Sequence, residues 1–189
     1  MRILSAVAIA AILSFSGTGL AMADDPYTDV MLYGKSLFAQ PVNPVPRATV
    51  MFPGNYKPGT IVISTRERRL YLVTGNGQAL RYGIGVGRDG FRWSGVHRIT
   101  AKKEWPSWTP PAQMLRRRPD LPRFMKGGPD NPLGARALYL GSTLYRIHGS
   151  NEPETIGQAV SSGCFRMTNE DVKDLYDRVS VGATVVVKN

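Results

Sequence analysis

Apolar and polar positions alternate along the chain from residue 59 onward, and this alternation predicts a series of short β-strands. The predicted strands cover residues 60–64, 70–73, 80–86, 96–102, 137–140, 144–147 and 181–187. A Gly75-Asn76-Gly77 turn joins the second and third strands, and Gly141-Ser142 joins the two strands after residue 136. The pattern therefore favours a mainly β domain that opens with a β-meander.

One segment near the end has the apolar spacing of an amphipathic helix. Thr168 is suited to cap the N-terminus of this helix, and Asp171 follows three residues later. The apolar positions at i, i+3, i+4 and i+7 are Val172, Leu175, Tyr176 and Val179. A shorter helical segment is predicted over residues 155–160. The domain is therefore expected to hold one or two short helices beside its strands.

Two stretches rich in proline and glycine interrupt this pattern. Residues 24–56 are Pro-rich and poorly periodic, which predicts an extended arm or linker. Residues 104–132 form a long connection, and its prolines at 106, 110 and 111 exclude regular structure over residues 105–111. Long ordered loops are uncommon and usually functional. The folded domain is accordingly expected to span residues 57–188.

The first 23 residues have the three parts of a secretory signal peptide. Arg2 supplies the positive start, residues 3–15 form a short apolar core, and Ala21-Met22-Ala23 is a cleavage site. The apolar core is short for a membrane anchor, which is the alternative interpretation. No Cys lies near the cleavage site, which excludes a lipoprotein. Cleavage after Ala23 would leave about 166 residues, one domain of ordinary size, with no stable membrane insertion.

Composition narrows the functional classes further. The single Cys excludes a disulfide scaffold and a Cys-rich metal site, and two His without an HExxH motif leave little for a catalytic metal. We therefore expect neither a metal nor a cofactor. The net charge of +10 suits an anionic partner. No helix-turn-helix pattern or RNA-binding aromatic motif accompanies this charge, so nucleic acid is not the expected partner.

The candidate chemistry lies in the stretch around the only Cys. Cys164 follows a Ser161-Ser162-Gly163 turn, and His148 precedes Cys164 by 16 residues at a predicted strand end. A chain path of that length can fold back and bring the two side chains together. An adjacent imidazole lowers the pKa of a thiol from about 8.5, and the thiolate then attacks a carbonyl. A lone Cys is most often a small core residue and a lone His is most often structural, so this interpretation depends on the two acting together.

These residues resemble a known family. His148-Gly149-Ser150, a spacer, and then Ser-x-Gly-Cys-hydrophobic-Arg ending at Arg166 match the motif of the YkuD-type L,D-transpeptidases of bacterial cell walls. The likeness covers residues 57–188, including the Trp-Thr-Pro and Gly-Pro-Asn-Asn-Pro-Leu-Gly loops. Asp130 replaces the first Asn of the second loop, and Ser162 replaces the His of many members. The resemblance implies a YkuD-like β-sandwich or mixed-sheet catalytic domain.

The resemblance also implies a reaction and a place for it. Such periplasmic enzymes cut the bond between an L-centred diamino acid and D-Ala in a peptidoglycan tetrapeptide stem, and the acyl group rests on the Cys as a thioester. An amine of another stem then accepts the acyl group as a 3–3 cross-link, or a Lys of an envelope protein accepts it. Water or a free D-amino acid can also serve. The family is typically sensitive to carbapenems and poorly sensitive to penicillins.

Carried over residue by residue, the resemblance gives Cys164 as nucleophile and His148 as base. The N–H groups of Gly163 and Cys164 would hold the oxyanion, and the carbonyl of Gly149 would orient the imidazole. The expected substrate contacts are Arg166, Ser161, Ser162, Ser150 and Tyr145, with Tyr139 and Trp108 as further candidates for the cleft wall. Two alternatives stay open: a hydrolase or L,D-carboxypeptidase on the same fold, and a wall-binding module without catalysis.

Overall fold

The computed structural model describes residues 43–189, and these residues form a mainly β domain, which confirms the predicted fold class. The strands are β1 (Ala48–Met51), β2 (Ile61–Ser64), β3 (Arg69–Gly75), β4 (Gln78–Gly83), β5 (Val86–Gly87), β6 (Gly95–Glu104), β7 (Arg136–Leu140), β8 (Arg146–His148), β9 (Ala159–Ser161), β10 (Phe165–Arg166) and β11 (Thr184–Lys188). The helices are α2 (Ala112–Arg117) and α3 (Asn169–Arg178), with a 3₁₀ turn, η1, at Pro153–Thr155.

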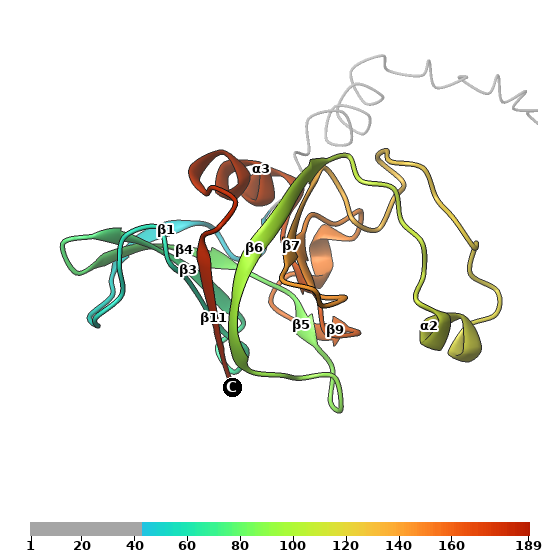
Figure 1. The fold of residues 1–189 in the computed structure, drawn as a ribbon, viewed down its shortest axis with the longest axis horizontal. Helices are drawn as coiled ribbons and strands as arrows, with labels where there is room; N and C mark the ends of the chain where they lie inside the picture. The colour runs from blue at the N-terminus through green and yellow to red at the C-terminus, as the bar shows by residue number, and fades with distance from the viewer. Residues whose placement is uncertain (1–42) are drawn as a thin grey trace, which may run out of the picture. The chain divides into compact units, whose positions relative to one another are not determined.

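Nine of the strands form one mixed sheet in the order β1-β4-β3-β2-β11-β6-β7-β8-β10. Most neighbours are antiparallel, but β11 runs parallel to β2 and β10 runs parallel to β8. The last strand, β11, therefore lies in the middle of the sheet, beside β6 (Figure 1). The parallel pair β8 and β10 lies at the end of the sheet order, where it carries the candidate site.

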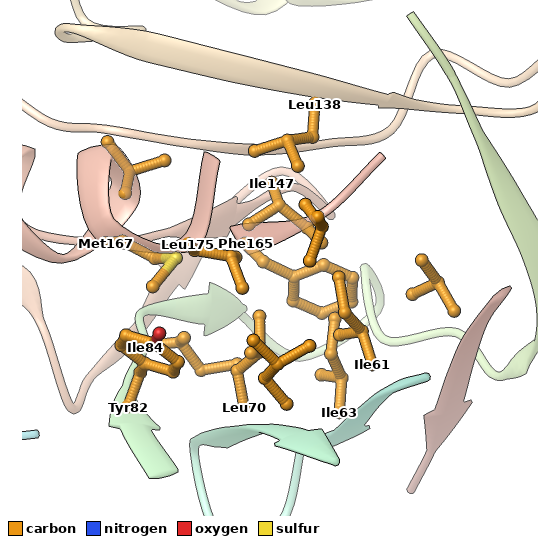
Figure 2. Packing of buried hydrophobic residues seen from close by; sticks show 14 of the residues in the cluster. Ile61, Ile63, Leu70, Tyr82, Ile84, Leu138, Ile147, Phe165, Met167 and Leu175 are labelled. Atoms are coloured by element: carbon orange, nitrogen blue, oxygen red, sulfur yellow. The ribbon is translucent and has the colours of Figure 1, made fainter. Parts of the chain in front are cut away.

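The hydrophobic core lies between the two halves of this sheet. Apolar side chains of β2, β3 and β4 face those of β7, β8, β10 and α3 (Figure 2). The largest fully buried members are Tyr82, Phe165, Ile61, Ile63, Leu70, Ile84, Ile99, Leu138, Leu140, Ile147, Met167 and Leu175. Burial of one such side chain stabilises the fold by about 1.5–3 kcal/mol. Ile147 and Phe165 belong to this core, so their packing fixes the positions of β8 and β10.

Helix α3 begins and ends with satisfied backbone groups. Thr168 caps its N-terminus as predicted, because its Oγ1 accepts a hydrogen bond from the Asp171 N–H at 3.1 Å. At the other end, the Lys102 ammonium from β6 donates to the carbonyls of Tyr176 at 2.5 Å and Val179 at 2.7 Å. The contacts of Lys102 fix the C-terminal end of the helix to β6.

Strand β1, within the predicted arm of residues 24–56, already belongs to the sheet. Residues 48–51 pair antiparallel with β4. Ahead of β1, Asn43 donates to Asp171 at 2.6 Å and Arg47 forms an ion pair with Asp174 at 3.0 Å. The surrounding prolines hid this short strand in the sequence pattern. The rest of the predicted arm and the predicted signal peptide lie outside the described residues.

The predicted helix over residues 155–160 is wrong. The 3₁₀ turn η1 ends at Thr155, Gly157 takes a positive φ of 87°, and β9 then pairs with β5. Pairing of the backbone with β5 satisfies the groups that a helix would have satisfied internally. The long loop is irregular over residues 105–111, as predicted, but it also contains α2, which the pattern did not indicate. No helix within residues 43–189 has the length and apolar character needed to cross a membrane.

Candidate active site

A cavity of about 380 Å³ contains both members of the predicted Cys–His pair. Cys164 and His148 lie in its lining, together with Ser161, Ser162 and Tyr145. Its other wall is the long loop, which contributes Trp108, Pro132, Leu133 and residues of α2. The loop closes on itself through two hydrogen bonds of 2.8 Å between the backbones of Trp108 and Met125. The ordered loop predicted to be functional therefore forms a wall of the cavity.

The parallel pairing of β8 and β10 explains how residues 16 positions apart meet. Phe165 lies opposite Ile147, and Arg166 lies opposite His148. Because side chains alternate between the two faces of a strand, Phe165 and Ile147 point into the core. Cys164, directly before β10, is then on the same face as His148. The structure brings the two side chains into one cavity, as the sequence analysis expected.

The imidazole of His148 is held in one orientation by the backbone. Its Nδ1 lies 2.6 Å from the carbonyl oxygen of Gly149, so Nδ1–H donates and Nε2 keeps its lone pair. A Cβ at Gly149 would meet the Asn169 Oδ1 at 2.3 Å, so the tight backbone here requires glycine. The same Asn169 oxygen accepts from the Ala135 N–H at 2.8 Å. The carbonyl predicted to orient the imidazole is therefore in contact with it.

Burial keeps both groups of the pair uncharged near neutral pH. Burial lowers the pKa of His148 to about 3, and the nearby charges of Arg166 and Arg146 act in the same direction. Burial raises the pKa of the Cys164 thiol above its ordinary value, although the charge of Arg146 opposes this rise. This direction is opposite to the expected fall in the thiol pKa, because a neutral imidazole offers the sulfur no positive charge. The pair meets substrate as thiol and free base.

The turn before the thiol is fixed by one hydroxyl. The Oγ of Ser161 accepts from the Gly163 N–H at 3.1 Å and donates to the Cys164 carbonyl at 2.6 Å. The sequence analysis assigned the Gly163 N–H to the oxyanion, whereas in the structure it donates to Ser161. Among residues 43–189, the Cys164 N–H has no such partner and is left as the available donor.

The predicted substrate contacts divide into two groups. Ser161, Ser162, Tyr145 and Arg166 line the cavity, whereas Ser150 does not. Ser150 is 2% exposed, and its Oγ accepts from the Glu152 N–H at 2.9 Å, so this hydroxyl stabilises a turn. The Arg166 guanidinium lines the cavity and also forms an ion pair of 2.7 Å with Glu152. Of the further candidates, Trp108 lines the cavity and Tyr139 does not.

The sequence analysis did not identify Arg146, the charged residue that lies opposite Cys164 in the register of β8 and β10. Arg146 lies two residues before His148 on the same face of β8, beside Cys164 across the strand pair. Its guanidinium donates to the Leu144 carbonyl at 3.2 Å, and the Cys164 Sγ lies 3.8 Å from the same oxygen. Because side chains alternate along a strand, the sequence alone places Arg146 and His148 on the same face. Only the register of β10 shows that it also lies beside the thiol.

The cavity has a strongly positive lining. Three arginines, Arg117, Arg146 and Arg166, line it, and no Asp or Glu among residues 43–189 does. Such a lining favours a substrate that carries a carboxylate. Within the described part of the chain, no group of three His, Cys, Asp or Glu side chains is arranged to hold a metal ion.

Comparisons with known proteins find similar sequences. A family model described as the L,D-transpeptidase catalytic domain, YkuD, matches residues 58–187. The probable L,D-transpeptidase ErfK/SrfK of Escherichia coli is 38% identical over 147 residues, which are 73% of this chain and 46% of that protein. The chain thus spans about half the length of the curated relatives it matches.

Solved structures show the same fold. An L,D-transpeptidase from Mycobacterium smegmatis aligns with a TM-score of 0.56 at 17% identity, over 69% of this chain and 58% of that chain. A structure from Brucella melitensis aligns with a TM-score of 0.52 at 48% identity, over 82% of this chain and 98% of that chain. That protein is described as a probable carnitine operon oxidoreductase.

Proposed function

Because this chain belongs to the L,D-transpeptidase catalytic-domain family, we propose that it is an acyltransferase that works through a thioester on Cys164. The observation that carries the proposal is the Cys164–His148 pair in one cavity. The imidazole Nδ1 lies 2.6 Å from the Gly149 carbonyl, and its Nε2 has no hydrogen-bond partner in the described part of the chain. A thiol, a positioned base and a backbone donor are the groups that acyl transfer needs. The oxidoreductase description belongs to the Brucella protein.

The proposed first half of the reaction leaves the acyl group on the enzyme. The thiol proton of Cys164 passes to Nε2 of His148, and the sulfur attacks the carbonyl carbon of the donor amide. The carbon–nitrogen bond then breaks, and the leaving amine takes the proton from His148. In the second half, an acceptor amine attacks the thioester and gives a proton to His148, which returns it to the departing thiolate.

We propose a peptidoglycan stem peptide as the donor. The positive lining of the cavity suits the carboxylates of a diamino acid and of D-Ala, and the Arg166 guanidinium is the proposed carboxylate ligand. Ser162 and Tyr145 are the proposed side-chain contacts, because both line the cavity beside the thiol. Transfer to the amine of another stem gives a 3–3 cross-link, and transfer to a Lys of an envelope protein attaches that protein to the wall.

We place this reaction in the periplasm, after cleavage of the signal peptide behind Ala23. The proposal rests on the three-part signal at residues 1–23 and on the family, whose substrate is the cell wall. The full chain has a net charge of +10, to which the signal contributes only Arg2, and the remaining positive charge would favour association with an anionic wall polymer.

Incubation with purified tetrapeptide muropeptides, followed by mass spectrometry, tests the proposed function. We expect cross-linked dimers that have lost D-Ala from the donor stem, and none with Cys164→Ala in parallel. Tripeptides without dimers would support the hydrolase alternative instead. Unchanged tetrapeptide would contradict both catalytic proposals and leave the wall-binding module.

A further inference from the structure

Trp93 holds the peptide that carries the Cys164 N–H. This half-buried residue lies between β5 and β6, and its indole Nε1–H donates to the carbonyl oxygen of Gly163 at 2.8 Å. That carbonyl belongs to the same planar trans peptide as the Cys164 N–H, so the two groups point in opposite directions. Fixing the carbonyl of Gly163 therefore also fixes the direction of the Cys164 N–H.

The indole ring is itself positioned by aromatic contacts. It stacks on Tyr145 with ring centroids 4.4 Å apart and planes 13° apart, and it lies 5.3 Å from the ring of Phe165. His97 meets it edge-on at 5.2 Å. Such packing leaves the ring little freedom, because aromatic pairs of this kind are favourable and Phe165 is fully buried. The Nε1–H therefore meets the Gly163 carbonyl at a defined position.

The turn is equally constrained on its own side. Gly163 has a φ of +110°, and a Cβ there would lie 2.6 Å from the Tyr145 ring. Ser161 holds the Gly163 N–H and the Cys164 carbonyl at the same time. The Gly163 carbonyl is bound by Trp93. Of the N–H and carbonyl groups of Gly163 and Cys164, only the Cys164 N–H therefore has no partner within the described residues.

We propose that Trp93 is a positioning residue for acyl transfer: its indole N–H aligns the Gly163–Cys164 peptide so that the Cys164 N–H receives the developing oxyanion. The inference rests on the proposed function. When sulfur bonds to the acyl carbon, the carbonyl electron pair moves to oxygen, and that oxygen accepts a hydrogen bond from the Cys164 N–H. The electron pair returns from the oxygen to re-form the carbonyl when the carbon–nitrogen bond breaks, and the amine leaves with the proton of His148.

The Trp93→Phe variant tests this role, because it keeps an aromatic ring and removes the donor. Two rates are compared: acylation by a carbapenem, which passes through an oxyanion, and alkylation by iodoacetamide, which displaces iodide without one. Loss of one oxyanion donor costs about 10²–10³ in rate, so misalignment of that donor is expected to slow acylation about 10- to 100-fold. Alkylation is expected to change less than about threefold, since the thiol and its base are untouched.

Trp105→Phe is the matched control, because Trp105 is exposed and does not line the cavity, and it should leave both rates unchanged. If Trp93→Phe lowers the melting temperature strongly, replacement of Trp93 by benzothienylalanine keeps the ring shape without the N–H. An equal fall in both rates, or unchanged acylation in the folded variant, would overturn the inference. Failure of the wild type to be acylated would instead contradict the proposed function.

Discussion

The Cys164→Ala variant is expected to lose transfer of tetrapeptide stems by at least about a thousandfold while it keeps its fold. The proposed nucleophile has no substitute, because Cys164 is the only Cys in the chain. Its side chain is half-buried and contributes little packing, and the turn is held by Ser161 and Trp93 instead. Turnover is measured by mass spectrometry of muropeptides and stability by thermal unfolding.

Cys164→Ser is the matched variant, because it keeps the size and a hydrogen-bonding group but lacks a comparably nucleophilic atom. We expect it to be as inactive as Cys164→Ala, with a melting temperature within a few degrees of wild type. Full residual activity in either variant would end the thioester mechanism. A large loss of stability in both would instead identify Cys164 as a buried core residue.

The His148→Ala variant is expected to be acylated about 10²- to 10⁴-fold more slowly, since general base catalysis contributes that much. Burial lowers the pKa of His148 to about 3, so the imidazole is already a free base throughout the range of pH 5 to 8. The wild-type acylation rate should therefore be flat across that range. In the variant the rate should rise with pH, because only the thiolate reacts and burial raises the pKa of the thiol.

His148→Gln controls for loss of a polar side chain, because an amide is not a base; it should be as slow as His148→Ala and should show the same rise with pH. A loss of less than tenfold in both variants would remove the base role. An inflection near pH 6.5 in the wild type alone would contradict the low pKa of the imidazole while leaving its role intact.

The elements with strong local signals could be predicted from sequence. The Thr168 cap and the apolar spacing after it determine α3, and the Gly75-Asn76-Gly77 turn adopts the positive φ angles that join β3 and β4. The short helix predicted over residues 155–160 failed because its backbone pairs with β5, which is distant in the chain. Strand β1 was not predicted for a similar reason, since its pairing with β4 determines its conformation more than its own four residues do.

The site shows the same division between local motif and distant contact. The motif around Cys164 and His148 predicted the pair and the orienting carbonyl of Gly149. It did not predict Arg146 beside the thiol, because that depends on the register of β8 and β10. It did not predict Trp93, which lies 70 residues from Gly163 in sequence and bonds to it through the fold alone.

Formation of a covalent adduct with a carbapenem tests the central claim most directly. A thioester-forming site that accepts a D-Ala amide should open the strained lactam, and the resemblance of the Cys motif to the L,D-transpeptidases implies carbapenem sensitivity. Intact-mass measurement followed by peptide mapping should find one drug molecule per chain, bound at Cys164, and none on Cys164→Ala. An adduct mapped to any other residue, or no adduct on folded wild-type protein, would contradict the account.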